Sequence, residues 1–469
     1  MATAAHANWG SAIGRSAICA LLAFAIISPA RAAPDEVDAN GAPVPSISTS
    51  LPNNPDGGLR KWLYERGLTY SFVLTSEALG NVSGGLRAGA VFQGKLETII
   101  KADLEKMLGL RGLSFFTNSF LIHNTGGIRR DYTRSFNTIS NIEALRTMRL
   151  SELWLEQKIG DTFSVRFGQL AADAEFFISD YYTPFMNSDW PTITGLNLPG
   201  GGPAYPLSTP GVRLKYEPNK QFTFLLALFN GDPAGPGPED PQIKNRYGLN
   251  FRVQDPPLLM GEAQFKYNQD KDATGLAGFW RLGFWHHFGQ FDSQRVDALG
   301  LSLANPLSTG IPARLLGTSG IYGIVDHQLY RPAGGGPDSG IGVFSRAGVS
   351  APDRNPVEFY WDGGIVFSGM ISGRPNDSFG ATFLYARMSR DGAALDRDTI
   401  FYTGVPQPVR DFELTLALAY MAQIVPGWVV QPAFHYIVHP GARIADPLAA
   451  PGTVAKDAAV FAVRSVITY

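Results

Sequence analysis

The sequence has a single cysteine, no long apolar run beyond its first thirty residues and no excess of basic charge. Cys19 is the only cysteine among 469 residues, which excludes a disulfide framework or a cysteine-ligated metal site. The longest later apolar stretch, 222–229, is interrupted by Thr223 and ends before Asn230, far short of the roughly 20 residues that a membrane-spanning helix needs. With 39 Lys and Arg against 41 Asp and Glu, the net charge is −2. A general electrostatic attraction to nucleic acid is therefore excluded as well.

The amino-terminal segment has the three parts of a secretory signal peptide. Arg15 precedes an apolar run over 16–27, and the small-residue sequence Ala30-Arg31-Ala32 follows. The run is too short to cross a bilayer as a helix, and the flanking residues make a buried amino-terminal helix the weaker interpretation. We predict that 1–32 is a signal peptide cleaved after Ala32, which leaves 469 − 32 = 437 residues without a thiol. The next segment, 33–58, is rich in Pro, Asn and Gly and predicts a loose periplasmic leader.

What the sequence does contain is 52 glycines, 55 aromatic residues (8 Trp, 17 Tyr, 30 Phe) and strand-type alternation. The last thirteen residues show this alternation most clearly. One side of that segment carries Ala459, Phe461, Val463, the weaker Ser465 and Ile467, and the other carries Arg464 and Thr468. A strand with lipid outside and water inside must be apolar at every second position. The segment also ends on aromatic Tyr469, as expected where an outer-membrane barrel meets the interface.

The same alternation recurs along the chain. In 90–104, Phe92 and Leu96 share one face while Lys95 and Glu97 share the other, so a slip of one residue would move charges into lipid. Further strands are predicted on this basis, including one over 246–254. We count about seventeen candidates, and because single-chain bacterial barrels favour even numbers, sixteen or eighteen strands are expected. The prediction is an all-β transmembrane antiparallel barrel over 59–469 that encloses an aqueous channel.

Two other classes of protein fit the sequence less well than the barrel does. A secreted β-sandwich would also alternate, but it gives no reason for aromatic residues at both ends of the outward rows. An enzyme would need a nucleophile or carboxylate placed with histidine. His286 and His287 are adjacent and so face opposite ways on a strand, while His435 and His439 are about 13 Å apart at roughly 3.3 Å per residue. Neither pair makes a metal or catalytic site, so no enzyme, no cofactor and no metal are expected.

Five stretches of the sequence resemble a known family. They are 104–112 (LEKMLGLRG); 150–157 (LSELWLEQ) with 167–170 (FGQL) and 175–176 (EF); 205–214 (YPLSTPGVRL); 361–364 (WDGG) with 373–377 (GRPND); and 431–441 (QPAFHYIVHPG). In order and spacing the chain resembles the carbohydrate-selective porins of bacterial outer membranes, the glucose-inducible porin group. The resemblance implies a sixteen-stranded barrel, narrowed by inward loops, that passes monosaccharides by facilitated diffusion. The chain departs from the pattern at Tyr469, where phenylalanine is usual, and at His435, where we would expect glutamine.

The predicted inward rows carry charges of both signs, which suits a sugar channel. Sugar hydroxyls bond to charged and amide groups, and the C–H faces of sugars pack on aromatic rings. The inward set comprises Lys95, Glu97, Glu152, Glu156, Arg166, Arg213, Lys215 and Arg246, and Trp154 lies between Glu152 and Glu156 on the same face. We expect Trp154, Arg166 and Arg213 to line the constriction. The alternative for each charge is that it faces a water-filled lumen and only stiffens the wall.

The segment 171–209 is too long for a turn and is crowded with aromatic residues among prolines and glycines. We expect this extracellular loop to fold into the pore and to present Trp190 or Tyr182 as a stacking surface for sugar. The alternative, held equally open, is a loop packed on itself or on lipopolysaccharide at the rim.

The expected location is the bacterial outer membrane, and the expected partners are a sugar, lipid and lipopolysaccharide, but not nucleic acid. The chain is expected to be a monomer or a homotrimer. The main rival function is a general or weakly anion-preferring diffusion porin. Anion preference would require an excess of basic residues along the inward rows. The inward set contains five basic and three acidic residues, which is a modest tilt.

Overall fold

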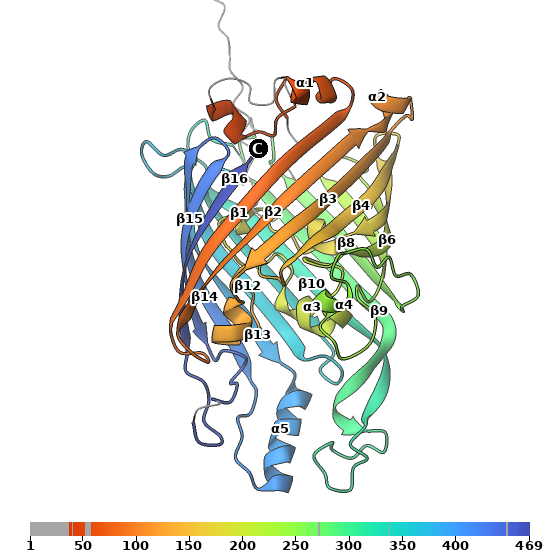
Figure 1. Cartoon of the computed structure of the whole chain (residues 1–469), viewed down its shortest axis with the longest axis vertical. Helices are drawn as coiled ribbons and strands as arrows, with labels where there is room; N and C mark the ends of the chain where they lie inside the picture. Colours follow the sequence, from red (N-terminus) through yellow and green to blue (C-terminus); the bar gives the residue numbers. More distant parts are fainter. Residues whose placement is uncertain (1–36, 40, 52–57, 271–272, 337, 447–448) are drawn as a thin grey trace, which may run out of the picture.

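A computed structural model describes residues 37–39, 41–51, 58–270, 273–336, 338–446 and 449–469. Sixteen antiparallel strands form one closed barrel in which each strand pairs with its neighbours in sequence and β1 pairs with β16 (Figure 1). The predicted fold class, with sixteen strands rather than eighteen, is confirmed. The predicted signal peptide, 1–32, lies outside the described residues.

The strands vary widely in length. They are β1 (Leu68–Ser83), β2 (Gly89–Asp103), β3 (Leu113–Asn124), β4 (Thr147–Ile159), β5 (Phe163–Leu170), β6 (Thr209–Tyr216), β7 (Phe222–Asn230), β8 (Pro257–Tyr267), β9 (Gly278–Asp297), β10 (Pro312–Tyr330), β11 (Gly340–Ser350), β12 (Val357–Ser368), β13 (Ser378–Met388), β14 (Phe412–Val425), β15 (Trp428–Val438) and β16 (Ala458–Thr468). The helices are α1 (Leu59–Tyr64), α2 (Leu104–Leu108), α3 (Thr192–Asn197), α4 (Pro241–Lys244) and α5 (Arg390–Thr403), with short helical turns η1 (Ile47–Ser50), η2 (Arg129–Thr133), η3 (Ala172–Ala174), η4 (Asp180–Tyr182) and η5 (Pro199–Gly201). None of the helices in the described ranges combines the length and apolar character needed to cross a bilayer.

Side chains alternate between the two faces of the wall as predicted. On β16, Phe461 and Val463 are half exposed on the outside, whereas Arg464 is fully buried on the inside. On β2, Phe92 lies outside while Lys95 and Glu97 are buried inside. The polar outward position of the last strand is satisfied locally, because the indole Nε1 of Trp428 donates a hydrogen bond of 3.0 Å to Ser465. This pleat explains how 17% charged residues fit a membrane barrel.

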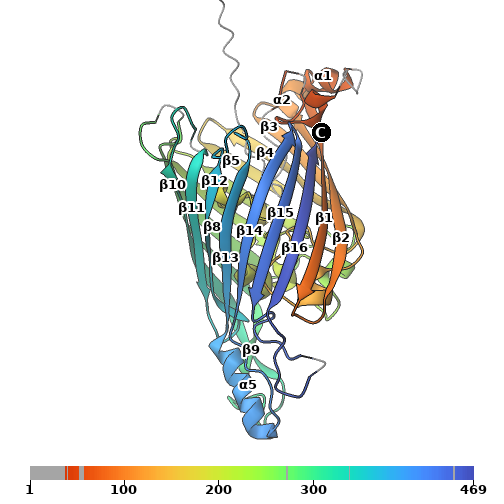
Figure 2. The same cartoon turned by 90° about the vertical axis from the view of Figure 1, so that its left-hand side faces the viewer.

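The two ends of the barrel differ. One end carries short turns, both termini of the described chain, α1 and α2 (Figures 1 and 2). The other end carries long loops and a protrusion in which α5 packs beside the extended β9–β10 hairpin (Figure 2). In outer-membrane barrels, short turns face the periplasm and long loops face the exterior. The protrusion was not predicted from the sequence.

The predicted strand over 246–254 is wrong. This segment belongs to the loop between β7 and β8, and Gly248 interrupts it with a left-handed φ of 70°. It runs beside β4 beyond the end of β5, where the Leu150 N–H donates to the Tyr247 carbonyl at 3.0 Å. Its alternating apolar side chains remain exposed on the outside of the barrel. Arg246 is exposed too and does not belong to an inward row.

Two extracellular loops fold into the lumen, where the sequence predicted one. The loop 171–208 follows β5, as expected. The loop 125–146, between β3 and β4, also enters: its Ser135, Phe136 and Asn137 all donate hydrogen bonds to Glu413 on the inner face of β14. These loops divide the interior of the barrel into a packed side and an open side.

The described part of the amino-terminal leader contacts the periplasmic turns. Ser46 is fully buried, and the backbone of Ser46 and Ile47 approaches Gly427 so closely that a Cβ there would lie 2.1 Å from the Ile47 nitrogen. Glycine is required in the β14–β15 turn for this close approach and for its φ of 76°.

Candidate functional site

The open side of the lumen holds a cavity of about 1,200 Å³ that reaches from the periplasmic turns to the inward loop. Its wall residues come from β1 to β9, together with one residue of β16 and residues of the short turns. Ala174, Glu175 and Ile178 from the loop 171–208 close its inner side. The cavity therefore lies off-centre, on the β1–β9 side of the barrel.

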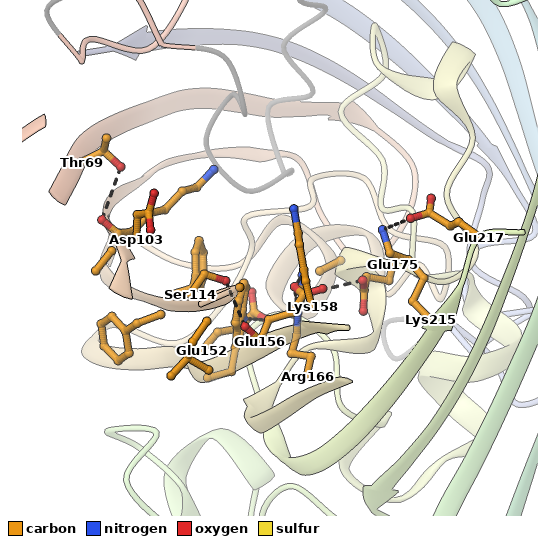
Figure 3. A pocket seen from close by; sticks show the side chains of 18 of the residues that line it. Thr69, Asp103, Ser114, Glu152, Glu156, Lys158, Arg166, Glu175, Lys215 and Glu217 are labelled. Carbon is orange, nitrogen blue, oxygen red and sulfur yellow. Dashed lines mark hydrogen bonds and ion pairs between the residues drawn. The ribbon is translucent and has the colours of Figure 1, made fainter. Parts of the chain in front are cut away.

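Two arginines and two glutamates form a closed ion-pair ring where this wall meets the loop. Figure 3 shows three of its members, Glu156, Arg166 and Glu175. Glu156 of β4 binds Arg166 of β5 at 2.8 Å and Arg213 of β6 at 3.2 Å. Glu175 of the loop binds Arg213 at 2.8 Å and Arg166 at 3.5 Å. Strand pairing makes the first half of the ring, because Glu156 lies opposite Arg166 and Arg166 lies opposite Arg213. The ring has no net charge and fixes the loop to the wall.

Trp154 supports this ring from within the wall. The guanidinium of Arg166 lies 3.8 Å from the centroid of the Trp154 ring. Phe116 of β3 stacks on the same indole at 4.7 Å with an interplanar angle of 13°. The indole Nε1 donates to Glu152 at 3.3 Å. Trp154 is half-buried and already engaged by these three neighbours, so its main effect is to orient Arg166 towards the cavity.

The charges around the cavity are almost balanced. Its basic side chains are Lys101, Lys106, Lys158, Arg166, Lys215, Lys266 and Arg281, and its acidic side chains are Asp103, Glu105, Glu152, Glu156, Glu175 and Glu217. Seven against six gives a smaller basic tilt than the predicted five against three. Some are paired within the wall, such as Lys215 with Glu217 at 2.8 Å (Figure 3). Such a surface offers donors and acceptors without a strong field of one sign.

The structure places the predicted site residues in three groups. Trp154, Arg166, Glu152, Glu156 and Lys215 line the cavity. Arg213, expected at the constriction, has a side chain only 1% exposed and lies behind Arg166. Lys95 and Glu97 pair with each other at 2.9 Å and are also buried.

The two aromatic residues proposed as stacking surfaces are buried in the loop's own packing. Tyr182 is 2% exposed and lies beneath the guanidinium of Arg346 at 4.2 Å. Trp190 is 7% exposed, meets Phe177 edge to face at 5.5 Å and donates its Nε1 hydrogen to the Gly201 carbonyl. Neither ring presents a free face in the structure, because the loop uses both to pack on itself and on the wall.

Several residues that shape the cavity were not singled out from the sequence. Glu175 was noted only within a motif, although it completes the ion-pair ring. Phe116 and Phe279 face inward. Each is apolar and has an apolar neighbour in the sequence, so no alternation of polar and apolar residues marks them as inward. Arg281 lies between Trp280 and Leu282, and that pattern could have identified it.

Inward-facing charges hold the loop 171–208 at several points. Arg346 of β11 donates to the Phe177 carbonyl at 2.8 Å and pairs with Asp362 of β12. Asp326 of β10 accepts from the Asp180 N–H at 3.0 Å and pairs with Arg281 at 2.7 Å. Within the described residues no group of three metal-ligating side chains occurs. The charged groups away from the cavity serve chiefly to position the loop.

Comparisons with known proteins bear on the family and the fold of the chain. A family model described as carbohydrate-selective porin, OprB family, matches residues 88–469. Porin B of Pseudomonas aeruginosa is 22% identical over 410 residues, which cover 82% of this chain and 86% of that protein. The high-pH structure of Pseudomonas putida OprB superposes with a TM-score of 0.76 at 21% identity, over 88% of this chain and 97% of that one. The low-pH structure of the same protein gives 0.51 at 17% identity, over 88% and 96%.

Proposed function

Because the chain belongs to the carbohydrate-selective porin family of the bacterial outer membrane, we propose that it carries monosaccharides of the glucose type across that membrane by facilitated diffusion. A member of this family is a transport channel and not an enzyme. The proposal concerns the class of sugar and the residues that meet it.

The observation that carries the proposal is the neutral ion-pair ring beside the cavity. Arg166, Glu156 and Glu175 hold one another at 2.8 to 3.5 Å, so their donors and acceptors are arranged before a solute arrives. A sugar can exchange hydroxyl hydrogen bonds with this set at little cost in reorganisation. An inorganic anion gains little, because the opposing carboxylates cancel the attraction of the arginines.

Single-channel recording in planar bilayers tests this proposal. Glucose added in steps should reduce the ion current saturably, because a sugar bound at the ring obstructs the ions. Trp154→Ala should weaken this block about tenfold, through loss of the support beneath Arg166. The matched control is Trp361→Ala on β12, whose indole lies on the outer face and bonds Ser345 at 2.9 Å, and it should leave the block unchanged.

Liposome uptake separates this function from its rival. We expect glucose to enter faster than inorganic phosphate. If phosphate enters while glucose does not, or if glucose never blocks the current at any concentration, the chain is a general or anion-preferring porin and the sugar proposal is wrong.

A further inference from the structure

The two short helices at the periplasmic rim expose apolar side chains. Leu59 and Trp62 of α1 are 53% and 51% exposed, and their spacing of three residues places them on one face. Leu108, at the end of α2, is 66% exposed and has exposed Met107 and Leu110 as neighbours. A cluster of this kind outside the barrel wall requires an explanation. We call residues 59–66 and 104–111 the rim pair.

The rim pair lies against the membrane-facing aromatic residues of the barrel. Arg60 of α1 places its guanidinium 4.4 Å from the ring of Tyr70 and 4.5 Å from that of Tyr469. Tyr70 is at an outward position of β1, and Tyr469 directly follows β16. α1 and α2 are joined through the Asp103 N–H, which donates to the Gly67 carbonyl at 2.8 Å. Both helices are at the same end of the barrel, beside the starts of β1 and β3 (Figure 1). The exposed apolar groups therefore continue the lipid-facing wall at the level of the interface.

The charge of the rim pair is basic. Away from the cavity, its exposed basic residues are Lys61, Arg66 and Arg111, and its exposed acidic residue is Glu65; Lys106 and Glu105 also line the cavity and carry opposite charges. Arg66 stacks over Trp62 at 4.2 Å, which combines a cation with an aromatic ring at the same position. Glu105 accepts a hydrogen bond from the Gly112 N–H, so part of its charge is used within the turn. Apolar and aromatic groups flanked by surplus cations match an anionic lipid surface.

We propose that the rim pair binds anionic phospholipid of the inner leaflet, with the apolar side chains among the upper acyl chains and the basic residues at the phosphates. The geometry of α1 against Tyr70 and Tyr469 places it at the required depth. This inference is independent of the solute that the channel carries.

Fluorescence quenching in nanodiscs tests the proposal. Leu59→Cys, in a chain with Cys19 replaced by Ala, has a single thiol that can be labelled with bimane. Brominated phosphatidylglycerol should quench this label at least about twofold more than brominated phosphatidylethanolamine at equal mole fraction, because the basic residues concentrate the anionic lipid. The side chains of Lys61 and Arg111 have no partner among the hydrogen bonds and ion pairs found in the described residues. The double variant Lys61→Glu with Arg111→Glu should bring the quenching ratio close to one.

The matched control reverses the charge of two exposed basic residues at the other end of the molecule. Arg390→Glu with Arg397→Glu on α5 should leave the quenching ratio unchanged. Equal quenching of the parent label by the two lipids would overturn the preference for anionic lipid. No quenching by either would show that the helices face water or a protein partner, and the proposal would fail. The quenching ratio of the labelled Leu59→Cys chain tests the proposal even if the charge-reversed variant does not fold.

Discussion

The two sides of the lumen are built differently although their strands alternate in the same way. The β2–β6 wall faces the cavity with charged groups such as Glu156, Arg166 and Lys215. The β11–β16 wall faces the inward loops with buried apolar groups and packs against Ile139, Phe185 and Met186 of those loops. No residue from β10 to β15 of the described chain lines the cavity. The cavity is off-centre because the inward loops pack closely against the β11–β16 wall and leave space beside the opposite wall.

The size of the inward side chains accounts for the difference. On the packed side they are often alanine or glycine, such as Ala417 and Ala433. A Cβ on Gly342 of β11 would lie 2.2 Å from the ring of Tyr181, and one on Gly380 of β13 would lie 3.0 Å from that of Phe185. Small residues on this wall leave room for loop aromatics to pack closely. On the opposite wall the loop is held by an ion-pair contact of Glu175 with Arg166 and Arg213, and the cavity remains beside that contact.

The largest effect is expected when the packed side is opened at Glu413. Its carboxylate accepts hydrogen bonds at 2.6 to 2.8 Å from Ser135 Oγ and from the backbone N–H groups of Phe136, Asn137 and Gly441. Glu413→Ala leaves these donors unpaired, at a cost of about 1–3 kcal/mol each when they stay buried. The loop 125–146 should then leave the lumen, and single-channel conductance should rise severalfold.

The control for this variant is Glu358→Ala on β12. Glu358 pairs with Arg387, whose side chain is 58% exposed, so conductance should not change. Gel mobility shows whether the barrel of Glu413→Ala is still folded. If it is folded and its conductance is also unchanged, the loop 125–146 is held by apolar packing alone.

An intermediate effect is expected when the packed side is overfilled. Gly342→Val places a side chain where Tyr181 lies and should cost about 1–3 kcal/mol of unfolding free energy. Urea unfolding from lipid vesicles measures the loss. Gly323→Val is the matched change at an outward position of β10, where the nearest atom to a Cβ is 3.9 Å away; equal losses in both variants would contradict the packing argument.

A smaller effect is expected on the open side, in ion selectivity. Glu175→Gln removes one negative charge from the neutral ring and should shift the reversal potential in a KCl gradient towards anions. Arg166→Gln should shift it towards cations. The two shifts should be of opposite sign and of similar size. Shifts of the same sign would show that the ring does not face the ion path.

The smallest effect is expected at the rim of the cavity. Lys215 and Glu217 pair at 2.8 Å, but their side chains are 31% and 38% exposed. Exposed pairs contribute about 0–1 kcal/mol, so Lys215→Gln should change glucose block by less than about twofold. If glucose block weakens as much as is expected for Trp154→Ala, the sugar binds beside Lys215 and Glu217 rather than at the ion-pair ring.

The sequence alone determined the barrel, its closure by the last strand and the inward or outward position of most side chains. A period of two is a local property, and membrane and water impose opposite demands on its two faces. The same alternation wrongly predicted a strand over 246–254, because alternation does not reveal whether a segment has a neighbouring strand with which it can pair. It also could not distinguish Arg166, which faces the cavity, from Arg213, which lies behind it.

Only the tertiary structure decided which wall the inward loops cover. That choice depends on residues distant in sequence, such as Ser135 with Glu413 and Glu175 with Arg213, which meet only after the barrel has closed. The burial of Tyr182 and Trp190 follows from the same contacts. Local alternation places a side chain on a face, but the fit of loop against wall determines whether that face meets solute or protein.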